Sequence, residues 1–294
     1  MHYTQSAFWR PLFETTGAML QVVQGCSHNA CKFCTMYRGT RFAVSPRQEV
    51  LDDIAELCAT PLRYAERVFL TGGDALCLPQ DNLVFVLEQL RASMPHLKSV
   101  GCFARVADVA RKTDEQLAQL AALGLDDVSI GAETGYDPAL AFMNKGHTAA
   151  DIVEQCARLD DAGIGYDLFY LAGIAGAGNY EANVRATVDV FGKTHPRRIM
   201  IHTLTLFEGA DLHQDIAEGA FEPSSETDIL RELRMLAAEL PCETMLLGSH
   251  AGNTVRFNAY LPEQREKVVA TFDQCIAIAD EERLRYFRKG VESM

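Results

Sequence analysis

The sequence contains no run of about 18 apolar residues, the length that a helix needs to cross a membrane, so it predicts no transmembrane helix and no membrane partner. Its first residues also lack the basic stretch followed by an apolar stretch of a secretory signal, and we therefore expect a cytoplasmic protein. Basic residues are in the minority: 27 Lys and Arg against 40 Asp and Glu give a net charge of −13. This balance argues against a broad nucleic-acid surface.

No internal repeat or low-complexity tract is present either; apolar runs alternate with helix-like patterns instead. The strand-like runs are residues 18–23, 67–71, 99–104, 126–132, 166–173 and 198–206. Alternation of this kind predicts an α/β fold with a parallel sheet and helices outside it. Six such units favour a partial (β/α)6 TIM-like barrel, and an open doubly wound sheet is the competing architecture.

Local signals predict where helices begin and how the chain is organised. Ser45 and Thr113 are expected to be the N-caps of helices over residues 45–60 and 113–124. After residue 206 the alternation stops, and a helix beginning at Ser225, a short strand and a terminal helix or helix pair are expected. We therefore predict an N-terminal extension, a barrel and a C-terminal helical and α+β appendage that closes the barrel, over residues 1–17, 18–206 and 207–294.

Three cysteines follow the first predicted strand, in the segment GCSHNACKFCTMYRG. Cys26, Cys31 and Cys34 lie where β/α folds keep their chemistry, at the C-terminal end of a strand. A structural zinc site would need a fourth ligand, for which His28 is the candidate. Three thiolates alone suit a [4Fe–4S] cluster, in which one iron stays open to another ligand. The cysteines by themselves thus indicate a metal site and leave both metals open.

The cysteine segment resembles that of the radical S-adenosylmethionine (radical SAM) superfamily, with the aromatic Phe33 before the third cysteine. The first gap is four residues here, one more than the common spacing. Gly72, Gly73 and Asp74 end the second strand and resemble the Gly-Gly-Glu motif that receives the amino group of S-adenosylmethionine. Asp replaces the commoner Glu and keeps the carboxylate. The resemblance implies that the three cysteines hold the cluster and that S-adenosylmethionine binds beside it.

A second segment, SIGAETGYDPALAFMNKGHT, resembles the subgroup of methylthiotransferases, Elongator-type enzymes and oxygen-independent coproporphyrinogen oxidases. By that resemblance Glu133 would lie near the cofactor ribose and Lys145 would pair with the methionine carboxylate. Asp167 would bind ribose hydroxyls, with an ion pair to an arginine as the alternative. Arg105 would contact the cofactor carboxylate or the substrate, or else pair with Asp108.

The resemblance implies an enzyme that cleaves S-adenosylmethionine reductively at a [4Fe–4S] cluster and abstracts hydrogen from a small-molecule substrate through a 5′-deoxyadenosyl radical. Reduced flavodoxin or ferredoxin would supply the electron. Two alternatives stay open: a non-catalytic haem or cluster chaperone of the same fold, and a zinc-stabilised β/α protein. His202, His213 and His250 are candidates to line a pocket, whereas the sequence names no substrate.

Overall fold

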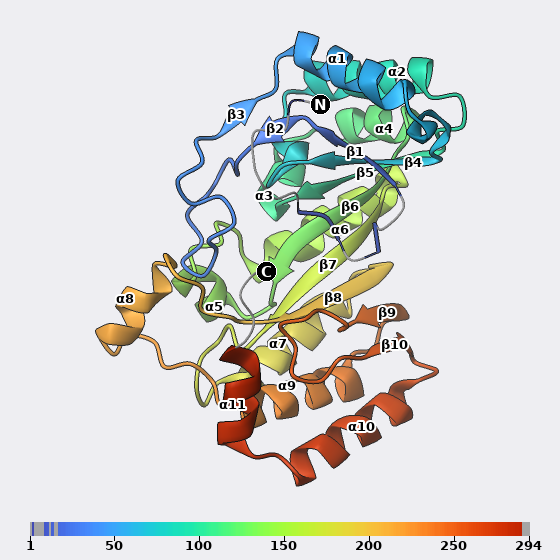
Figure 1. The fold of residues 1–294 in the computed structure, drawn as a ribbon. Coiled ribbons are helices and arrows are strands. Elements are labelled where there is room, and N and C mark those ends of the chain that lie inside the picture. The colour runs from blue at the N-terminus through green and yellow to red at the C-terminus, as the bar shows by residue number, and fades with distance from the viewer. Residues whose placement is uncertain (1, 3–8, 12, 15–16, 290–294) are drawn as a thin grey trace. The chain divides into compact units, whose positions relative to one another are not determined.

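The computed structural model describes residues 2, 9–11, 13–14 and 17–289. The chain forms two compact units (Figure 1): residues 1–29, 39–131 and 157–166 make the first, and residues 30–38, 132–156 and 167–294 make the second. The predicted extension over residues 1–17 lies mostly outside the described residues, and the predicted boundaries stay a prediction. Within the described ranges, no helix is both long enough and apolar enough to span a bilayer.

The first unit contains a parallel sheet with the strand order β1–β4–β5–β6. Its strands are β1 (Ala18–Gln21), β4 (Arg67–Thr71), β5 (Ser99–Ala104) and β6 (Leu125–Glu133), of which the last two residues belong to the second unit. A separate antiparallel pair consists of β2 (Val23–Gln24) and β3 (Ala43–Val44). Apolar side chains such as Val68 and Leu70 are fully buried, because both faces of a parallel sheet are covered.

The helical elements of the first unit are α1 (Arg47–Cys58), η1 (Pro61–Tyr64), η2 (Ala75–Cys77), α2 (Gln80–Ser93), α3 (Val106–Ala110) and α4 (Asp114–Ala122). Helices α1 and α2 lie side by side (Figure 1). The predicted cap of α4 is confirmed, since Thr113 accepts a hydrogen bond from the Gln116 amide. The predicted Ser45 cap is wrong: α1 begins after Pro46 without a side-chain cap, and the Ser45 amide donates to the Val22 carbonyl instead.

The strand order of the second unit is β7–β8–β9–β10, with β10 antiparallel to β9. These strands are β7 (Gly165–Ala172, its first two residues in the first unit), β8 (Arg198–Thr203), β9 (Thr244–Leu247) and β10 (Asn258–Leu261). Its helices are α5 (Asp137–Phe142), α7 (Tyr180–Phe191), α8 (Leu212–Ala217), α9 (Glu226–Glu239), α10 (Arg265–Ala277) and α11 (Glu281–Lys289). Helix α6 (Ala149–Ala162) begins in the second unit and ends in the first.

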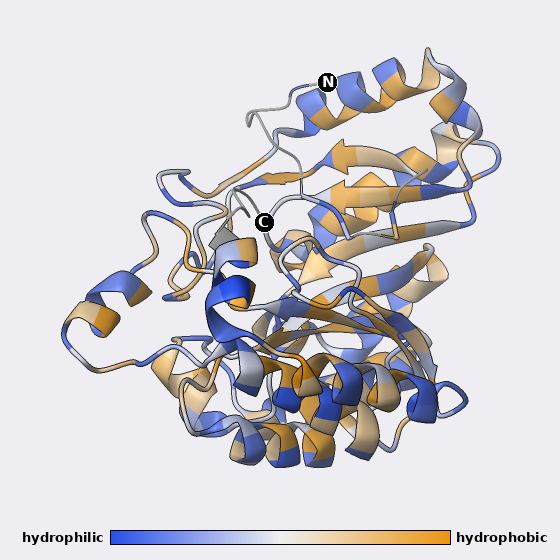
Figure 2. Ribbon diagram, turned by 60° about the horizontal axis from the view of Figure 1, so that its bottom comes forward, coloured by the Kyte–Doolittle hydropathy of each residue, from blue (hydrophilic) through white to orange (hydrophobic). Residues whose placement is uncertain are grey.

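Helix α9 packs against both α7 and α10 (Figure 1). Figure 2 shows these helices striped, with hydrophobic and hydrophilic residues alternating along each, as expected for helices with one buried face. The predicted Ser225 cap is confirmed, since its side chain accepts a hydrogen bond from the Asp228 amide. The predicted short strand is β9, and the predicted terminal helix pair is α10 and α11.

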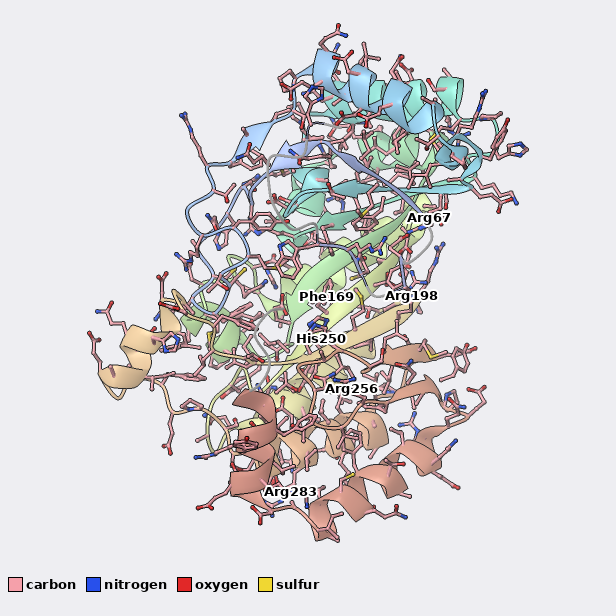
Figure 3. All side chains as sticks on the ribbon, in the orientation of Figure 1. Arg67, Phe169, Arg198, His250, Arg256 and Arg283 are labelled. Carbon is pink, nitrogen blue, oxygen red and sulfur yellow. The ribbon has the colours of Figure 1, made fainter. Side chains whose placement is uncertain are left out.

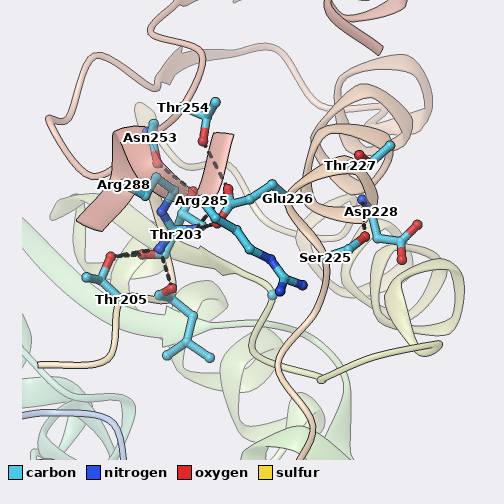
Figure 4. A network of polar contacts seen from close by, with 12 residues as sticks. Thr203, Thr205, Ser225, Glu226, Thr227, Asp228, Asn253, Thr254, Arg285 and Arg288 are labelled. Carbon is cyan, nitrogen blue, oxygen red and sulfur yellow. Dashed lines mark hydrogen bonds and ion pairs between the residues drawn. The ribbon is translucent and has the colours of Figure 1, made fainter. Parts of the chain in front are cut away.

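The last helix is tied to the end of β8 by one buried arginine (Figure 4). Arg288 forms an ion pair with Glu226, at 3.1 Å, and donates to the Leu204 carbonyl and the Thr205 hydroxyl. Thr254 adds a hydrogen bond to the same carboxylate. These contacts fix α11 next to the loops that follow β8 and β9.

Candidate cofactor site

The glycine pair after β4 packs directly on the first cysteine. The Gly73 amide donates to the Gly25 carbonyl at 2.8 Å. A Cβ atom added to Gly73 would lie 2.7 Å from the Cβ atom of Cys26, closer than real Cβ contacts come. Gly72 has a φ of 125°, a left-handed conformation that favours glycine. The pair is therefore required for the backbone of the cysteine segment to approach the end of β4.

Asp74 is fully buried and holds the residue after Cys26. Its carboxylate accepts hydrogen bonds from the Ser27 amide at 3.0 Å and from the Ser27 hydroxyl at 2.5 Å. Burial and then the charge of Asp74 raise the pKa of the Cys26 thiol, and the same two causes raise the pKa of Cys77 to about 12. Without a bound cation, the pocket around Cys26 thus favours the neutral thiol, and a cationic iron centre would reverse that preference.

Arg105 lies directly after β5, and its backbone amide donates a hydrogen bond of 2.8 Å to the Asp108 carboxylate. Arg105 therefore does contact Asp108, as the alternative predicted from the sequence, and it does so through its backbone amide. Its guanidinium is also near enough to Cys26 to lower the pKa of that thiol. Asp108 is buried, and burial together with Asp74 raises its pKa to about 6. The ends of β4 and β5 therefore bring Cys26, Asp74 and Arg105 into one electrostatic group within the first unit.

The second unit gathers the other predicted residues around a buried lysine. The Lys145 ammonium binds the Glu133 carboxylate at 3.0 Å and lies 5.6 Å from the centre of the Phe33 ring. Burial alone would lower the pKa of Lys145, but the charge of Glu133 and the thiolates of Cys31 and Cys34 raise it to about 12. Five predicted site residues from three separate segments thus meet in this unit.

Glu133 occupies a strained position at the C-terminal end of β6. Its φ of 68° lies in the left-handed region, which costs a non-glycine residue about 1–3 kcal/mol and persists only where surrounding contacts enforce it. The carboxylate and the Lys145 side chain are 13% and 6% exposed. Removing one partner of such a buried pair costs about 3–5 kcal/mol, because the other charge is left uncompensated.

Two acidic residues, one at the start of α8 and one within it, anchor the segment that carries Cys31 and Cys34. Asp215 binds Lys32 at 2.7 Å and Asp211 binds Arg38 at 2.6 Å. Arg38 in turn donates to the Cys34 carbonyl. This role of α8 was not among the expectations from the sequence. The acidic composition of residues 207–226, facing a cysteine segment with basic residues, was the available signal.

An apolar cluster supports the ring between these two cysteines. Phe33 packs against buried side chains from α5, β7, α8 and the adjoining loops, namely Ala139, Met143, Leu171, Ile174, Leu204, Leu212 and Phe221. Its position before the third cysteine thus has a packing reason in addition to its contact with Lys145.

Asp167 lies elsewhere. It is the third residue of β7 and is fully buried, and Arg198, the first residue of β8, binds it with two hydrogen bonds of 2.7 and 2.9 Å. Figure 3 shows Arg198 at the start of its strand, away from His250. The structure therefore shows the ion pair that the sequence left as the alternative to a ribose contact.

Two of the three candidate histidines lie together. The rings of His202, near the end of β8, and His250 stack with centres 4.2 Å apart, and the Phe169 ring meets His202 edge-on. Burial lowers the pKa of His202 to about 3, so that its imidazole is neutral at physiological pH. His213 is exposed on α8 and contacts the Phe207 carbonyl. The register of β8 places His202 beside Leu171, a member of the apolar cluster under Phe33.

All nine cysteines are free thiols. Within the described part of the chain, no group of three or more His, Cys, Asp or Glu side chains is arranged to hold a metal ion. Three cysteine thiols within nine residues of sequence are nevertheless the kind of donor that iron–sulfur clusters use. The Lys145 ammonium supplies positive charge beside two of these thiols.

The profile of the family described as "Radical SAM superfamily" matches residues 20–188, more than half of the chain. Among curated proteins, the tRNA uridine(34) acetyltransferase of Methanocaldococcus jannaschii is 22% identical over 130 residues. That match covers 44% of this chain and 24% of the relative. The chain therefore corresponds to about a quarter of the relative, whose activity does not transfer with the match.

Solved structures share the fold at low identity. The radical S-adenosylmethionine methyltransferase TsrM from Kitasatospora setae, with cobalamin and a [4Fe–4S] cluster bound, has a TM-score of 0.56 and 20% identity, covering 69% of this chain and 39% of TsrM. Coproporphyrinogen III oxidase HemN from Escherichia coli has a TM-score of 0.56 and 16% identity, covering 74% of this chain and 51% of HemN. These likenesses confirm the predicted partial TIM-like barrel over the open doubly wound sheet.

Proposed function

This chain belongs to the radical SAM superfamily, and we propose that it cleaves S-adenosylmethionine reductively and abstracts hydrogen from a small-molecule substrate. Members of this superfamily are enzymes that use a [4Fe–4S] cluster and S-adenosylmethionine, and these are the cofactors of this chain. The observation that carries the proposal is the group of Cys31, Cys34, Phe33 and Glu133 around the Lys145 ammonium.

In the proposed site Cys26, Cys31 and Cys34 ligate the cluster. A bound cluster would supply the single electron for reductive cleavage of S-adenosylmethionine to methionine and the 5′-deoxyadenosyl radical. Reduced flavodoxin or ferredoxin supplies that electron. Lys145 carries three N–H donors, one of which binds Glu133, and it is suited to orient the methionine carboxylate.

In the first unit, we propose that Gly72, Gly73 and Asp74 receive the amino group and that Arg105 supports the carboxylate. Asp74 also keeps Ser27, and with it Cys26, in place. We leave Asp167 out of the cofactor contacts, because Arg198 already binds both of its carboxylate oxygens. We propose that the aromatic side chains of His202, His250 and Phe169 contact the substrate, since His202 adjoins the apolar cluster that supports Phe33.

The tRNA substrate in the name of the archaeal relative is not proposed here. The match covers 24% of that protein, and the net charge of −13 does not favour a polyanion. A small-molecule substrate in the cytoplasm is the proposal that the composition favours.

Anaerobic reconstitution with iron and sulfide tests the cofactor assignment. The chain should turn brown, with broad absorption near about 400 nm from iron–thiolate charge transfer. A colourless protein that carries one zinc ion would contradict the cluster. Dithionite and S-adenosylmethionine should then release 5′-deoxyadenosine. An intact cluster that releases none would favour the chaperone alternative.

A further inference from the structure

A buried carboxylate on α9 joins two turns of the second unit. Glu232 is fully buried. It accepts hydrogen bonds from the Tyr170 hydroxyl at 2.5 Å, the side-chain amide of Asn183 at 2.9 Å and the backbone amide of Gly173 at 3.0 Å. The Gly173 bond reaches the turn that follows β7. In the described part of the chain Glu232 has no cationic partner, so these three donors stabilise its charge.

Asn183 extends this network toward the end of β6. Its side-chain nitrogen donates to Glu232, which leaves its side-chain oxygen to accept the Thr134 hydroxyl at 2.5 Å. The same hydroxyl of Thr134 accepts the Tyr136 amide, and the Gly135 amide donates to the Thr187 hydroxyl on α7. Thr134, Asn183 and Thr187 are all fully buried. A continuous chain of hydrogen bonds therefore runs from Glu232 to the turn of residues 134–136.

That turn directly follows Glu133, whose φ of 68° must be enforced by its surroundings. Gly135 contributes to the constraint, because a Cβ atom there would lie 2.7 Å from the Ala186 carbonyl oxygen on α7. The turn thus packs closely on α7, and both Thr134 and Gly135 donate hydrogen bonds to side chains of that helix. The orientation of the Glu133 carboxylate, and through it of Lys145, depends on this attachment.

We propose that Glu232 is a positioning residue for the cofactor site: through Asn183 and Thr134 it holds the turn that aims Glu133 at Lys145. The inference rests on the proposed function, because it assigns the network a role in binding S-adenosylmethionine. Glu232 touches neither the cysteines nor Lys145 and acts only through the turn.

The ionised form of Glu232 is the one that suits its partners, since all three offer hydrogens to it. A protonated carboxyl would add a fourth hydrogen among three donors and would release one of them. Burial raises the pKa of Glu232 to about 7 although these hydrogen bonds lower it. The other titratable groups facing it are Asp228 on α9, which raises the pKa further, and Tyr170 on β7, whose own pKa is raised well above its ordinary value. The attachment of the turn should therefore weaken as the pH falls through about 7.

The test measures S-adenosylmethionine binding to the reconstituted holoenzyme by titration calorimetry, with Glu232→Gln beside the unchanged chain. Above about pH 8 the variant should bind about tenfold more weakly, the loss typical of an outer-shell change. Below about pH 6 the two should converge, because the unchanged chain is then protonated at Glu232. Taking the ratio of the two dissociation constants at each pH cancels the titration of the ligand itself.

Amide hydrogen exchange supplies a readout that does not involve the cofactor. Glu232→Gln should speed exchange in residues 134–136, where the Gly135 and Tyr136 amides are bonded to the network. Asp167→Asn is the matched control. Like Glu232→Gln it removes the charge of a fully buried carboxylate, but the partner of Asp167 is Arg198. That control should change neither the exchange of residues 134–136 nor the affinity for S-adenosylmethionine.

Thr134→Val cuts the network at its other end and leaves Glu232 with all three donors. It should weaken binding about as much as Glu232→Gln does, and the double variant should be no worse than either, because residues that act in one network are not additive. In the unchanged chain the hydrogen bond from Tyr170 lowers the pKa of Glu232. Tyr170→Phe removes that bond, so the pH at which S-adenosylmethionine binding is half weakened should move upward. Both variants keep the proposal testable if Glu232→Gln does not fold.

Unchanged affinity in Glu232→Gln and Thr134→Val, or a ratio that does not vary with pH, would each overturn the positioning role. An unchanged chain that holds its cluster and binds no S-adenosylmethionine would instead contradict the proposed function. The two failures are therefore distinguishable.

Discussion

Two buried carboxylate–cation pairs in the second unit, each with its carboxylate on a strand, look alike in the sequence and differ in where they lie on those strands. Glu133 ends β6 and binds Lys145 with one hydrogen bond of 3.0 Å. Asp167 is near the start of β7 and binds Arg198 with two, at 2.7 and 2.9 Å. The first pair adjoins Cys31, Cys34 and the Phe33 ring.

The difference in position and in cation is what separates the proposed binding pair from the structural one. In β/α folds the C-terminal strand ends carry chemistry, and the N-terminal ends carry stability. The planar guanidinium matches both oxygens of one carboxylate, so the Asp167–Arg198 pair completes itself. An ammonium with three donors leaves the Glu133–Lys145 pair suited to a further anionic group.

The strongest way to break this comparison is to remove a thiol beside Lys145. Cys34→Ala should abolish the brown colour and the release of 5′-deoxyadenosine, because a cluster with two protein thiolates lacks a ligand. Iron content and the absorption spectrum measure the loss. Cys58→Ala is the control, since that thiol donates to the Ser93 carbonyl in the first unit. Full colour and cleavage in Cys34→Ala would refute the ligand assignment.

The next effect separates binding from stability at the first pair. The double variant Glu133→Gln with Lys145→Met should unfold within about 1 kcal/mol of the unchanged chain, because replacing a whole buried ion pair is often neutral. Its affinity for S-adenosylmethionine should fall about tenfold to a hundredfold, the worth of a hydrogen bond to a charged group. Denaturant unfolding and titration calorimetry give the two numbers. Unimpaired binding would place the carboxylate contact elsewhere.

The second pair should show the opposite behaviour. Asp167→Asn should lower the free energy of unfolding by about 3 kcal/mol, because Arg198 keeps a charge without its partner. Affinity for S-adenosylmethionine should stay within about twofold, a difference of well under 1 kcal/mol. A large loss of affinity with little loss of stability would return Asp167 to the ribose role that the sequence resemblance implies.

The most gradual effect concerns Glu232, a buried carboxylate that, unlike the two pairs, is bonded to neutral donors. Its pKa is raised from the ordinary 4.5 to about 7 in the folded chain, so the folded state binds the proton more tightly than the unfolded state does. Between these values stability should fall as the pH rises, by up to about 1 kcal/mol per pH unit. Glu232→Gln should remove that part of the slope in denaturant unfolding, and an unaltered slope would contradict the raised pKa.

Stability and affinity should therefore respond to pH in opposite senses. Protonation of Glu232 relieves the cost of burying its charge, whereas ionisation completes the hydrogen bonds that hold residues 134–136. A chain in which both quantities rose together with pH would argue against a positioning role for this carboxylate.

The sequence predicted the β/α order well, because period-2 and helical patterns are local properties. It also predicted the Thr113 cap, where a Gln three residues later completes a capping box. The Ser45 cap failed because the backbone of that residue bonds to Val22, more than twenty positions away. Likewise, nothing local in the sequence distinguishes Asp167 from Glu133 as a ligand for a cofactor, since Arg198 is 31 residues from its partner.

By itself, the sequence determined the family, the partial barrel and the cysteine segment, because these depend on residue types at short spacing. Only the tertiary structure decided which carboxylate accompanies the cysteines and which closes on an arginine. It also revealed that α8 anchors the segment of Cys31 and Cys34 and that α9 supplies Glu232 to the turn after β6. Such contacts join residues tens to nearly two hundred positions apart, and their energies depend on burial and distance, which no local pattern encodes.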